Sequence, residues 1–183
     1  MFKLKYLPIL YSLLIMSAYA ENTEKIIENL KKTKNINFDF EQNINQKIEN
    51  GNCTIEYPKK IFCEYLGNNN KIIVSNGESL IIRTSASYYR YPLKKTHLNY
   101  ILDKNFLINK ISNLKGKIIN GSYLNYSIIE GDNEINILFD NKFFNLIGWQ
   151  TKDIYQNVNI TFLSSIKRNQ KIKKNLFNLP TQN

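Results

Sequence analysis

The side chains of this 183-residue chain that could do catalytic chemistry are few and scattered. His97 is the only histidine, so neither a metal site made of histidines nor a paired-histidine mechanism can form. Asp39 and Glu41 lie two residues apart, as paired acids on a strand face would, but a solvated strand face has the same spacing, and we favour that interpretation. The sequence also lacks a Gly-x-Ser-x-Gly elbow, a phosphate loop and a His-Glu-x-x-His motif. We therefore expect no enzyme activity, no metal and no cofactor.

The two cysteines, Cys53 and Cys63, allow a different kind of chemistry. They flank a turn at residues 57–60, and a hairpin that pairs Ile55 with Ile61 also pairs the two cysteines. Opposed residues of antiparallel strands lie about 4.5–5.5 Å apart, which a disulfide can span. Two buried free thiols are the alternative. Export from the cytoplasm, for which the N-terminus argues, favours the disulfide because exported compartments permit it.

The first 20 residues have the pattern of a secretory signal peptide. Lys3 and Lys5 form a short positive region, residues 6–16 are mainly apolar, and the small residues Ala18 and Ala20 stand where a signal peptidase reads them. A membrane anchor is the alternative, but a spanning helix needs about 20 apolar residues. We expect cleavage after Ala20, so that residues 21–183 form one mature domain in the periplasm.

Composition narrows the classes of partner. The chain has 25 basic and 15 acidic residues, a formal net charge of +10. Such a basic exported protein could meet anionic lipid head groups, acidic partners or nucleic acid. The export signal argues against nucleic acid, and the basic pairs lie at predicted turns and ends, which indicates a diffuse basic surface.

The apolar residues of the chain mostly follow the period of β-strands. Residues 35–48 alternate polar and apolar side chains, which predicts a long strand with one apolar face, and Asn50-Gly51 predicts the turn that follows. Further strands separated by turn signals are predicted over residues 53–57, 61–65, 72–75, 79–83, 88–91, 117–120, 124–129, 134–139, 146–152 and 158–163.

Helical spacing occurs at the start and in the middle of the chain. Thr23 can cap a short helix that presents Ile26, Ile27 and Leu30 on one face, and residues 96–102 and 105–114 predict two more short helices. Strands joined by hairpins predict one antiparallel sheet that closes as an up-and-down barrel or curls strongly. The helices would then cover its open side.

Several segments, in the order of the chain, resemble the LolA family of periplasmic lipoprotein carriers. Phe38-x-Phe40-x-Gln42 is similar to the family's Phe-x-x-x-Phe-x-Gln region. Five further segments resemble motifs of the same family. They are Pro58–Tyr65 around a hairpin, Ile73–Leu80 in the next hairpin, Tyr91–Leu98 at the start of the lid, Gly148–Asp153, and Phe177–Pro180 near the end. Each motif is weakly specific alone, and together they cover nearly all of the chain after the signal peptide.

The resemblance implies a mainly β fold with some α, a half-open (incomplete) antiparallel β-barrel with a helical lid over an apolar cavity. It also implies a periplasmic chaperone that receives acylated lipoproteins from an inner-membrane lipoprotein-releasing transporter and delivers them to the outer membrane, with or without a receptor there. We expect a monomer. The apolar strand and lid residues expected to line the cavity are Ile36, Phe38, Phe40, Ile44, Ile55, Tyr57, Ile61, Tyr65, Leu98, Ile101, Leu102 and Phe106. The same residue types would also make an ordinary packed core.

The sequence departs from the family around the hairpin proline. Family members often have an arginine directly before it that bonds to the lid backbone, whereas this chain has Tyr57, and Phe62 replaces an arginine of the following strand. We expect Tyr57 to pack against the lid near Leu98.

Two other functions remain open. A receptor-like or lipid-sensing module could share the fold, although a receptor would need a lipobox cysteine and the first cysteine after Ala20 is Cys53. An exported hydrolase is the other alternative, and it would need a catalytic set that the sequence does not offer.

Overall fold

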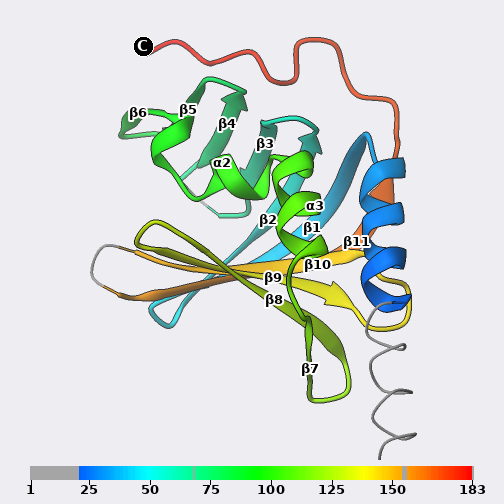
Figure 1. Cartoon of the computed structure of the whole chain (residues 1–183). Helices are drawn as coiled ribbons and strands as arrows, with labels where there is room; N and C mark the ends of the chain where they lie inside the picture. Colours follow the sequence, from blue (N-terminus) through cyan, green and yellow to red (C-terminus); the bar gives the residue numbers. More distant parts are fainter. Residues whose placement is uncertain (1–20, 68, 154–155, 183) are drawn as a thin grey trace, which may run out of the picture.

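The computed structural model describes residues 21–67, 69–153 and 156–182, so the predicted signal peptide lies outside the described residues. The described chain forms an 11-stranded antiparallel sheet in the order β6-β5-β4-β3-β2-β1-β11-β10-β9-β8-β7. The strands are β1 (Asn35–Ile44), β2 (Lys47–Glu56), β3 (Lys60–Tyr65), β4 (Ile72–Asn76), β5 (Ser79–Arg83), β6 (Tyr88–Pro92), β7 (Lys117–Ile119), β8 (Tyr123–Glu130), β9 (Asn133–Asp140), β10 (Leu146–Lys152) and β11 (Val158–Arg168). The sheet curls, but its edge strands β6 and β7 do not pair (Figure 1). The predicted half-open antiparallel fold is confirmed.

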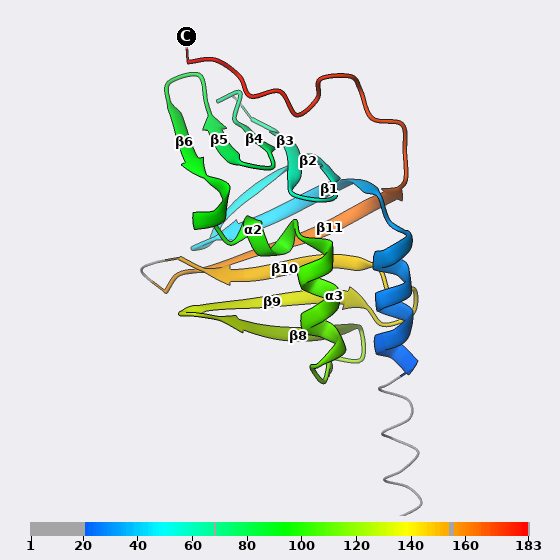
Figure 2. The same cartoon turned by 45° about the horizontal axis from the view of Figure 1, so that its top comes forward.

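Helices cover the concave face of the sheet. Between β6 and β7 the chain forms η1 (Leu93–Lys95), α2 (Leu98–Ile101) and α3 (Lys104–Ser112), which we call the lid (Figure 2). The Asp103 side chain caps α3 by accepting a hydrogen bond from the backbone N–H of Phe106 at 3.1 Å. Leu107 and Ile111 of α3 are fully buried and belong to the same core as the sheet. The lid therefore packs on the sheet through its apolar face.

A further helix, residues 21–32, precedes β1 and lies at one end of the sheet (Figure 2). Its Ile26 and Leu30 are buried in the same core, as their helical spacing predicted. On β1, Phe38 and Phe40 face this core, whereas Asp39 and Glu41 are exposed. The two carboxylates therefore belong to the solvated outer face of the strand, as expected.

The first hairpin turn lies earlier than the sequence indicated. Strand β1 ends at Ile44 and the turn is Asn45-Gln46, both with positive φ (50° and 70°), as a two-residue hairpin turn of type I′ requires. The predicted turn at Asn50-Gly51 is therefore wrong, and Gly51 lies inside β2. A Cβ at this position would come within 2.1 Å of the Glu64 carbonyl oxygen and 2.7 Å of the Phe40 ring. Gly51 thus allows close packing within the sheet. A glycine in the sequence can indicate either such packing or a turn, and its residue type does not tell the two apart.

The C-terminal segment after β11 runs back along the outer side of β3 to β6 (Figures 1 and 2). The Tyr88 hydroxyl donates to the Pro180 carbonyl at 3.2 Å, and the buried Phe177 ring lies 5.8 Å from Lys60 Nζ. Val74 and Ile81, which point outward from β4 and β5, are each 1% exposed. These contacts tie the tail to β6 through Tyr88 and to β3 through Lys60.

The predicted disulfide between Cys53 and Cys63 is confirmed. The cysteines are directly opposed in the β2–β3 pair, in the register that also opposes Ile55 and Ile61. No helix among the described residues is long and apolar enough to span a bilayer.

We predict that the disulfide contributes substantially to stability. It links residues separated by 10 in sequence, and the chain-entropy model gives about 2–3 kcal/mol for a loop of this length. Urea denaturation of the Cys53→Ala/Cys63→Ala variant should therefore show a free energy of unfolding lower by about that amount. Reduced wild-type protein, with both thiols alkylated after unfolding, is the control for the substitutions. A loss below about 0.5 kcal/mol in the variant would contradict the prediction.

Candidate functional site

The concave face contains a solvent-accessible cavity of about 320 Å³ between the strands and α2. This volume is near the lower end of the roughly 300–1,000 Å³ typical of small-molecule sites. Half of the expected lining residues border it, namely Phe40, Ile44, Ile61, Tyr65, Leu98 and Ile101. The Phe40 ring stands edge-on to Tyr65, with ring centroids 4.8 Å apart, and together they form an aromatic part of the wall.

The other expected lining residues, Ile36, Phe38, Ile55, Tyr57, Leu102 and Phe106, do not border this cavity. Ile55 and Leu102 are fully buried, and Phe38 packs edge-on against Trp149 at 6.3 Å. Ile36 and Tyr57 border a separate hollow of about 20 Å³ together with Leu30 of the 21–32 helix. Because this helix fills one end of the concave face, the apolar side chains there are packed core, and the open volume lies toward the β1–β2 hairpin.

Several residues of the cavity wall were not expected from the sequence. The apolar ones are Ile73, Leu80, Ile82 and Trp149, and both cysteines also border the cavity. The alternation of Leu80 and Ile82 in β5 was a usable signal for them. The polar ones are Gln42, Lys71, Thr96, His97, Thr151, Asn159 and Thr161. Gln42 follows Phe40 at a spacing of two, which places it on the inward face of β1. Nothing in the sequence indicates that Thr151 of β10 and Thr161 of β11 border the cavity.

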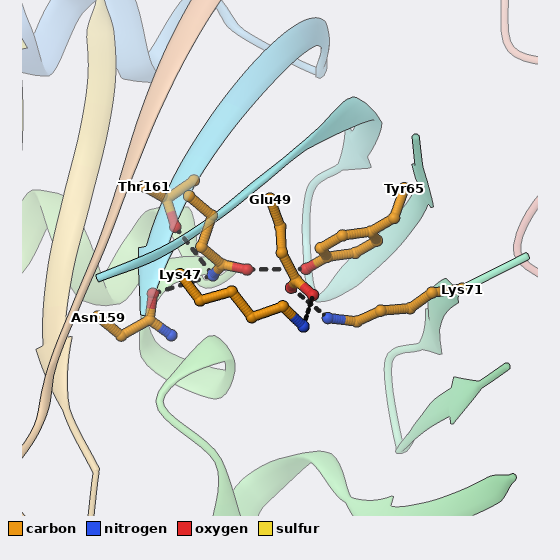
Figure 3. A network of polar contacts seen from close by, with 7 residues as sticks. Lys47, Glu49, Tyr65, Lys71, Asn159 and Thr161 are labelled. Atoms are coloured by element: carbon orange, nitrogen blue, oxygen red, sulfur yellow. Dashed lines mark hydrogen bonds and ion pairs between the residues drawn. The ribbon is translucent and has the colours of Figure 1, made fainter. Parts of the chain in front are cut away.

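Gln42 is the centre of a polar network at the hairpin end of the cavity, and Figure 3 labels its partners Tyr65, Asn159 and Thr161. Its Nε2 donates to Asn159 Oδ1 at 3.0 Å and to Thr161 Oγ1 at 3.1 Å. Its Oε1 accepts a hydrogen bond from the Tyr65 hydroxyl at 3.0 Å. Both N–H groups and the oxygen of the Gln42 amide therefore have hydrogen-bond partners within the protein.

A charged group adjoins this network. Glu49 lies 2.6 Å from Lys71 Nζ and 3.0 Å from Lys47 Nζ (Figure 3), and Lys71 Nζ is 3.9 Å from the centre of the Tyr65 ring. Burial alone would raise the pKa of Glu49, but the hydrogen bonds and charges of Lys71 and Lys47 together outweigh it and lower this pKa. Burial raises the pKa of Tyr65 far above neutrality, so its hydroxyl remains a donor to Gln42.

One edge of the lid is tied to the β2–β3 hairpin and to the 21–32 helix. The backbone N–H of Lys59 donates to the Leu102 carbonyl at 2.8 Å, and Lys59 Nζ is 3.5 Å from the Asp103 carboxylate. Lys104 Nζ donates to the Thr33 carbonyl at 2.9 Å and is 3.4 Å from that of Lys31. Carbonyls at a helix C-terminus carry partial negative charge, so they suit a lysine.

Tyr57 lies beside the lid helix α3. Lys104 Nζ of α3 lies 5.9 Å from the centre of its ring, and the ring borders the hollow beneath the 21–32 helix. Lys104 is therefore one lid residue beside Tyr57, and packing of Tyr57 near Leu98 stays a prediction.

The opposite edge of the lid is tied to the β8–β9 hairpin. His97 Nε2 lies 2.8 Å from Asn133 Oδ1, and Lys110 Nζ lies 2.7 Å from the Glu130 carboxylate. His97 therefore has a positioning partner, as a packing or surface histidine would. Within the described ranges, no three His, Cys, Asp or Glu side chains gather in a way that could hold a metal ion.

Comparison with known proteins gives a family match. The model of the outer membrane lipoprotein carrier protein LolA family matches residues 31–180. No curated protein matches the sequence.

Solved structures that are similar to this chain are distant from it in sequence. An uncharacterized conserved protein from Thermus thermophilus has a TM-score of 0.53 at 6% identity, covering 89% of this chain and 94% of its own. A LolA superfamily protein from Nitrosomonas europaea has a TM-score of 0.45 at 8% identity, covering 86% and 97%. Lipoprotein LppX from Mycobacterium tuberculosis has a TM-score of 0.46 at 9% identity, covering 86% and 98%. At 6% identity the likeness to the Thermus thermophilus protein concerns the fold alone.

We predict that Lys104 fastens the lid. In Lys104→Gln the two helix-end carbonyls lose a charged donor, so the amides of α3 should exchange hydrogen about three- to tenfold faster, as for a loss of about 1 kcal/mol in local opening. Hydrogen-exchange mass spectrometry of the α3 peptides measures this. Lys94→Gln, at an exposed lid position, is the matched control and should leave exchange unchanged. Equal protection of α3 in both variants would show that the apolar face alone holds the lid.

Proposed function

The chain belongs to the outer membrane lipoprotein carrier protein LolA family, and from this premise we propose that it is a periplasmic carrier that shields the acyl chains of lipoproteins. The observation that supports this most directly is the cavity between the concave face and the lid, with a largely apolar wall that includes Phe40, Ile61 and Ile101. Each methylene withdrawn from water contributes about 0.8 kcal/mol. An acyl chain therefore gains greatly from such a wall while it crosses an aqueous compartment.

The volume of the cavity bears on how cargo enters. About 320 Å³ is enough for only part of a group with several acyl chains. Leu98 and Ile101 of α2 border the cavity and are the apolar part of the wall that the lid supplies. We infer that cargo displaces the lid outward and then packs against the same lid residues.

The remaining steps of the proposal concern where the protein acts. Cleavage after Ala20 would release residues 21–183 into the periplasm, where an inner-membrane lipoprotein-releasing transporter would supply cargo and the outer membrane would receive it. The protein would act as a monomeric binding protein and not as an enzyme. A general lipid binder of the same fold is the competing function, and the nature of the bound ligand separates the two.

The first test is the ligand that the protein carries when purified from a periplasm. Native mass spectrometry should show a mass addition that fragments to a triacylated peptide. Phospholipid alone as the bound species would contradict the carrier function and support a general lipid binder.

The second test places a charge in the cavity. Ile82 borders the cavity and is only partly buried, so Ile82→Glu should fold, while the carboxylate would have to lose water when an acyl chain binds. We expect the affinity for a fluorescent acyl probe to fall by about tenfold or more. Ile129→Glu, at a position 73% exposed on β8, is the matched control and should bind normally. Wild-type affinity in Ile82→Glu, with an unchanged circular dichroism spectrum, would place the acyl site elsewhere.

A further inference from the structure

The hairpin end of the cavity has a polar wall that hydrocarbon alone does not require. Gln42 and Thr161 are directly opposed across the β1–β11 pair, and Thr151 and Asn159 across the β10–β11 pair. All of them border the cavity. Polar groups removed from water without partners are costly, so a cavity that held only acyl tails would be better lined here with apolar residues.

The hydrogen-bond partners within this wall leave an excess of donors. Because Thr161 Oγ1 and Asn159 Oδ1 both accept from Gln42, the Thr161 hydroxyl proton and the Asn159 amide N–H groups remain for other partners. Among the described residues, neither these donors nor the Thr151 hydroxyl has a hydrogen-bond acceptor. Thr161 is 3% exposed and Thr151 is 8% exposed, so what exposure their side chains have is mainly toward the cavity that they border. The wall thus presents several donors to the cavity, on the buried Thr151 and Thr161 and on the half-buried Asn159.

We propose that this donor wall binds the ester carbonyl oxygens of a diacylglyceryl group, and that Gln42 is the residue that positions the donors. This deepens the proposed function and rests on it, since the acyl chains of the cargo would bring these carbonyls with them. A carbonyl oxygen only accepts hydrogen bonds, so it can use the Thr161 hydroxyl proton and the Asn159 amide N–H groups that remain as donors in this wall. Through its contacts with Thr161 and Asn159, the Gln42 amide turns both donors away from itself.

The position of the wall also sets the direction of the ligand. Tyr65 and Lys71 border both the cavity and a solvent-facing hollow that includes Lys47 and Asn50. The head group would therefore leave toward the β1–β2 hairpin, while the acyl chains run inward past Ile61 and Leu80. The pair of lysines on Glu49 leaves one positive charge in excess at this exit, which suits a neutral or acidic head group and disfavours a basic one.

The experiment compares two synthetic lipopeptides with the same peptide and the same chain length, one with ester-linked and one with ether-linked chains at the glyceryl group. The ether removes only the carbonyl oxygens. Titration calorimetry or displacement of a bound dye should show wild type binding the ester form about tenfold more tightly, as for about two net hydrogen bonds. In Thr161→Val and in Gln42→Leu this preference should fall below about threefold, while the affinity for the ether form is retained.

Thr96→Val is the matched control in the same cavity. Thr96 also borders it, but its hydroxyl already donates to the Leu93 carbonyl at 2.8 Å. Its ester preference should equal that of wild type. Gln42→Leu removes three hydrogen bonds, so the thermal unfolding of each variant is measured beside its titration. If Gln42→Leu does not fold, the result for Thr161→Val decides whether the carbonyl site exists.

The outcomes separate this inference from the function on which it rests. Equal affinity of wild type for the ester and ether forms would overturn the carbonyl site and leave the acyl carrier intact. Retention of the full preference in Thr161→Val, or its loss in Thr96→Val, would also overturn it. Failure of wild type to bind either lipopeptide would refute the carrier function itself.

Discussion

The structure depends on one constraint, which is that an open, curled sheet with one apolar face must keep that face from water. An 11-stranded sheet whose edges do not meet cannot bury its concave side against itself. Phe38, Phe40 and Ile55 are nevertheless less than 5% exposed. The helix at residues 21–32 and the lid provide the missing cover, so they have to be apolar on the side that faces the sheet. Their side chains do not fill the concave face evenly, and the cavity is the space that they leave unfilled between the sheet and α2.

Because one face of the sheet must be apolar, the sequence was enough to predict which side chains of the strands lie inward. The alternation in β1 placed Phe38 and Phe40 inward and Asp39 outward, and register alone paired Cys53 with Cys63. Asn50-Gly51 was misread because a glycine tolerates a turn and also allows the Phe40 ring to approach the backbone of β2 closely. Local patterns indicate on which face of the sheet a side chain lies, and for these strands they were enough to predict the inward and outward side chains.

The site was harder to predict, because it depends on position along a strand. Ile36 and Ile44 belong to one alternating run of β1, yet the first borders a hollow of about 20 Å³ and the second a cavity of about 320 Å³. The difference comes from the 21–32 helix, which packs over one end of the concave face, and no property of β1 itself encodes it. The polar end was harder still, since Gln42 meets Thr161 and Asn159 only when the chain returns as β11 beside β1. Nothing in the composition of β11 sets these residues apart.

The division of polar and apolar contacts also bears on how a lid can both close and yield. The polar contacts lie at its edges, where Lys104 meets the Thr33 carbonyl and His97 meets Asn133. Its centre touches the cavity through Leu98 and Ile101, which interact by burial alone. Apolar burial is not directional and scales with area, so under the proposed function an entering acyl chain would replace the contacts that these residues would lose if the lid lifted. The net resistance to opening then comes mainly from the edge contacts, which are partly exposed and modest in strength. An occupied cavity can therefore remain sheltered from water without requiring the lid to return to its empty position.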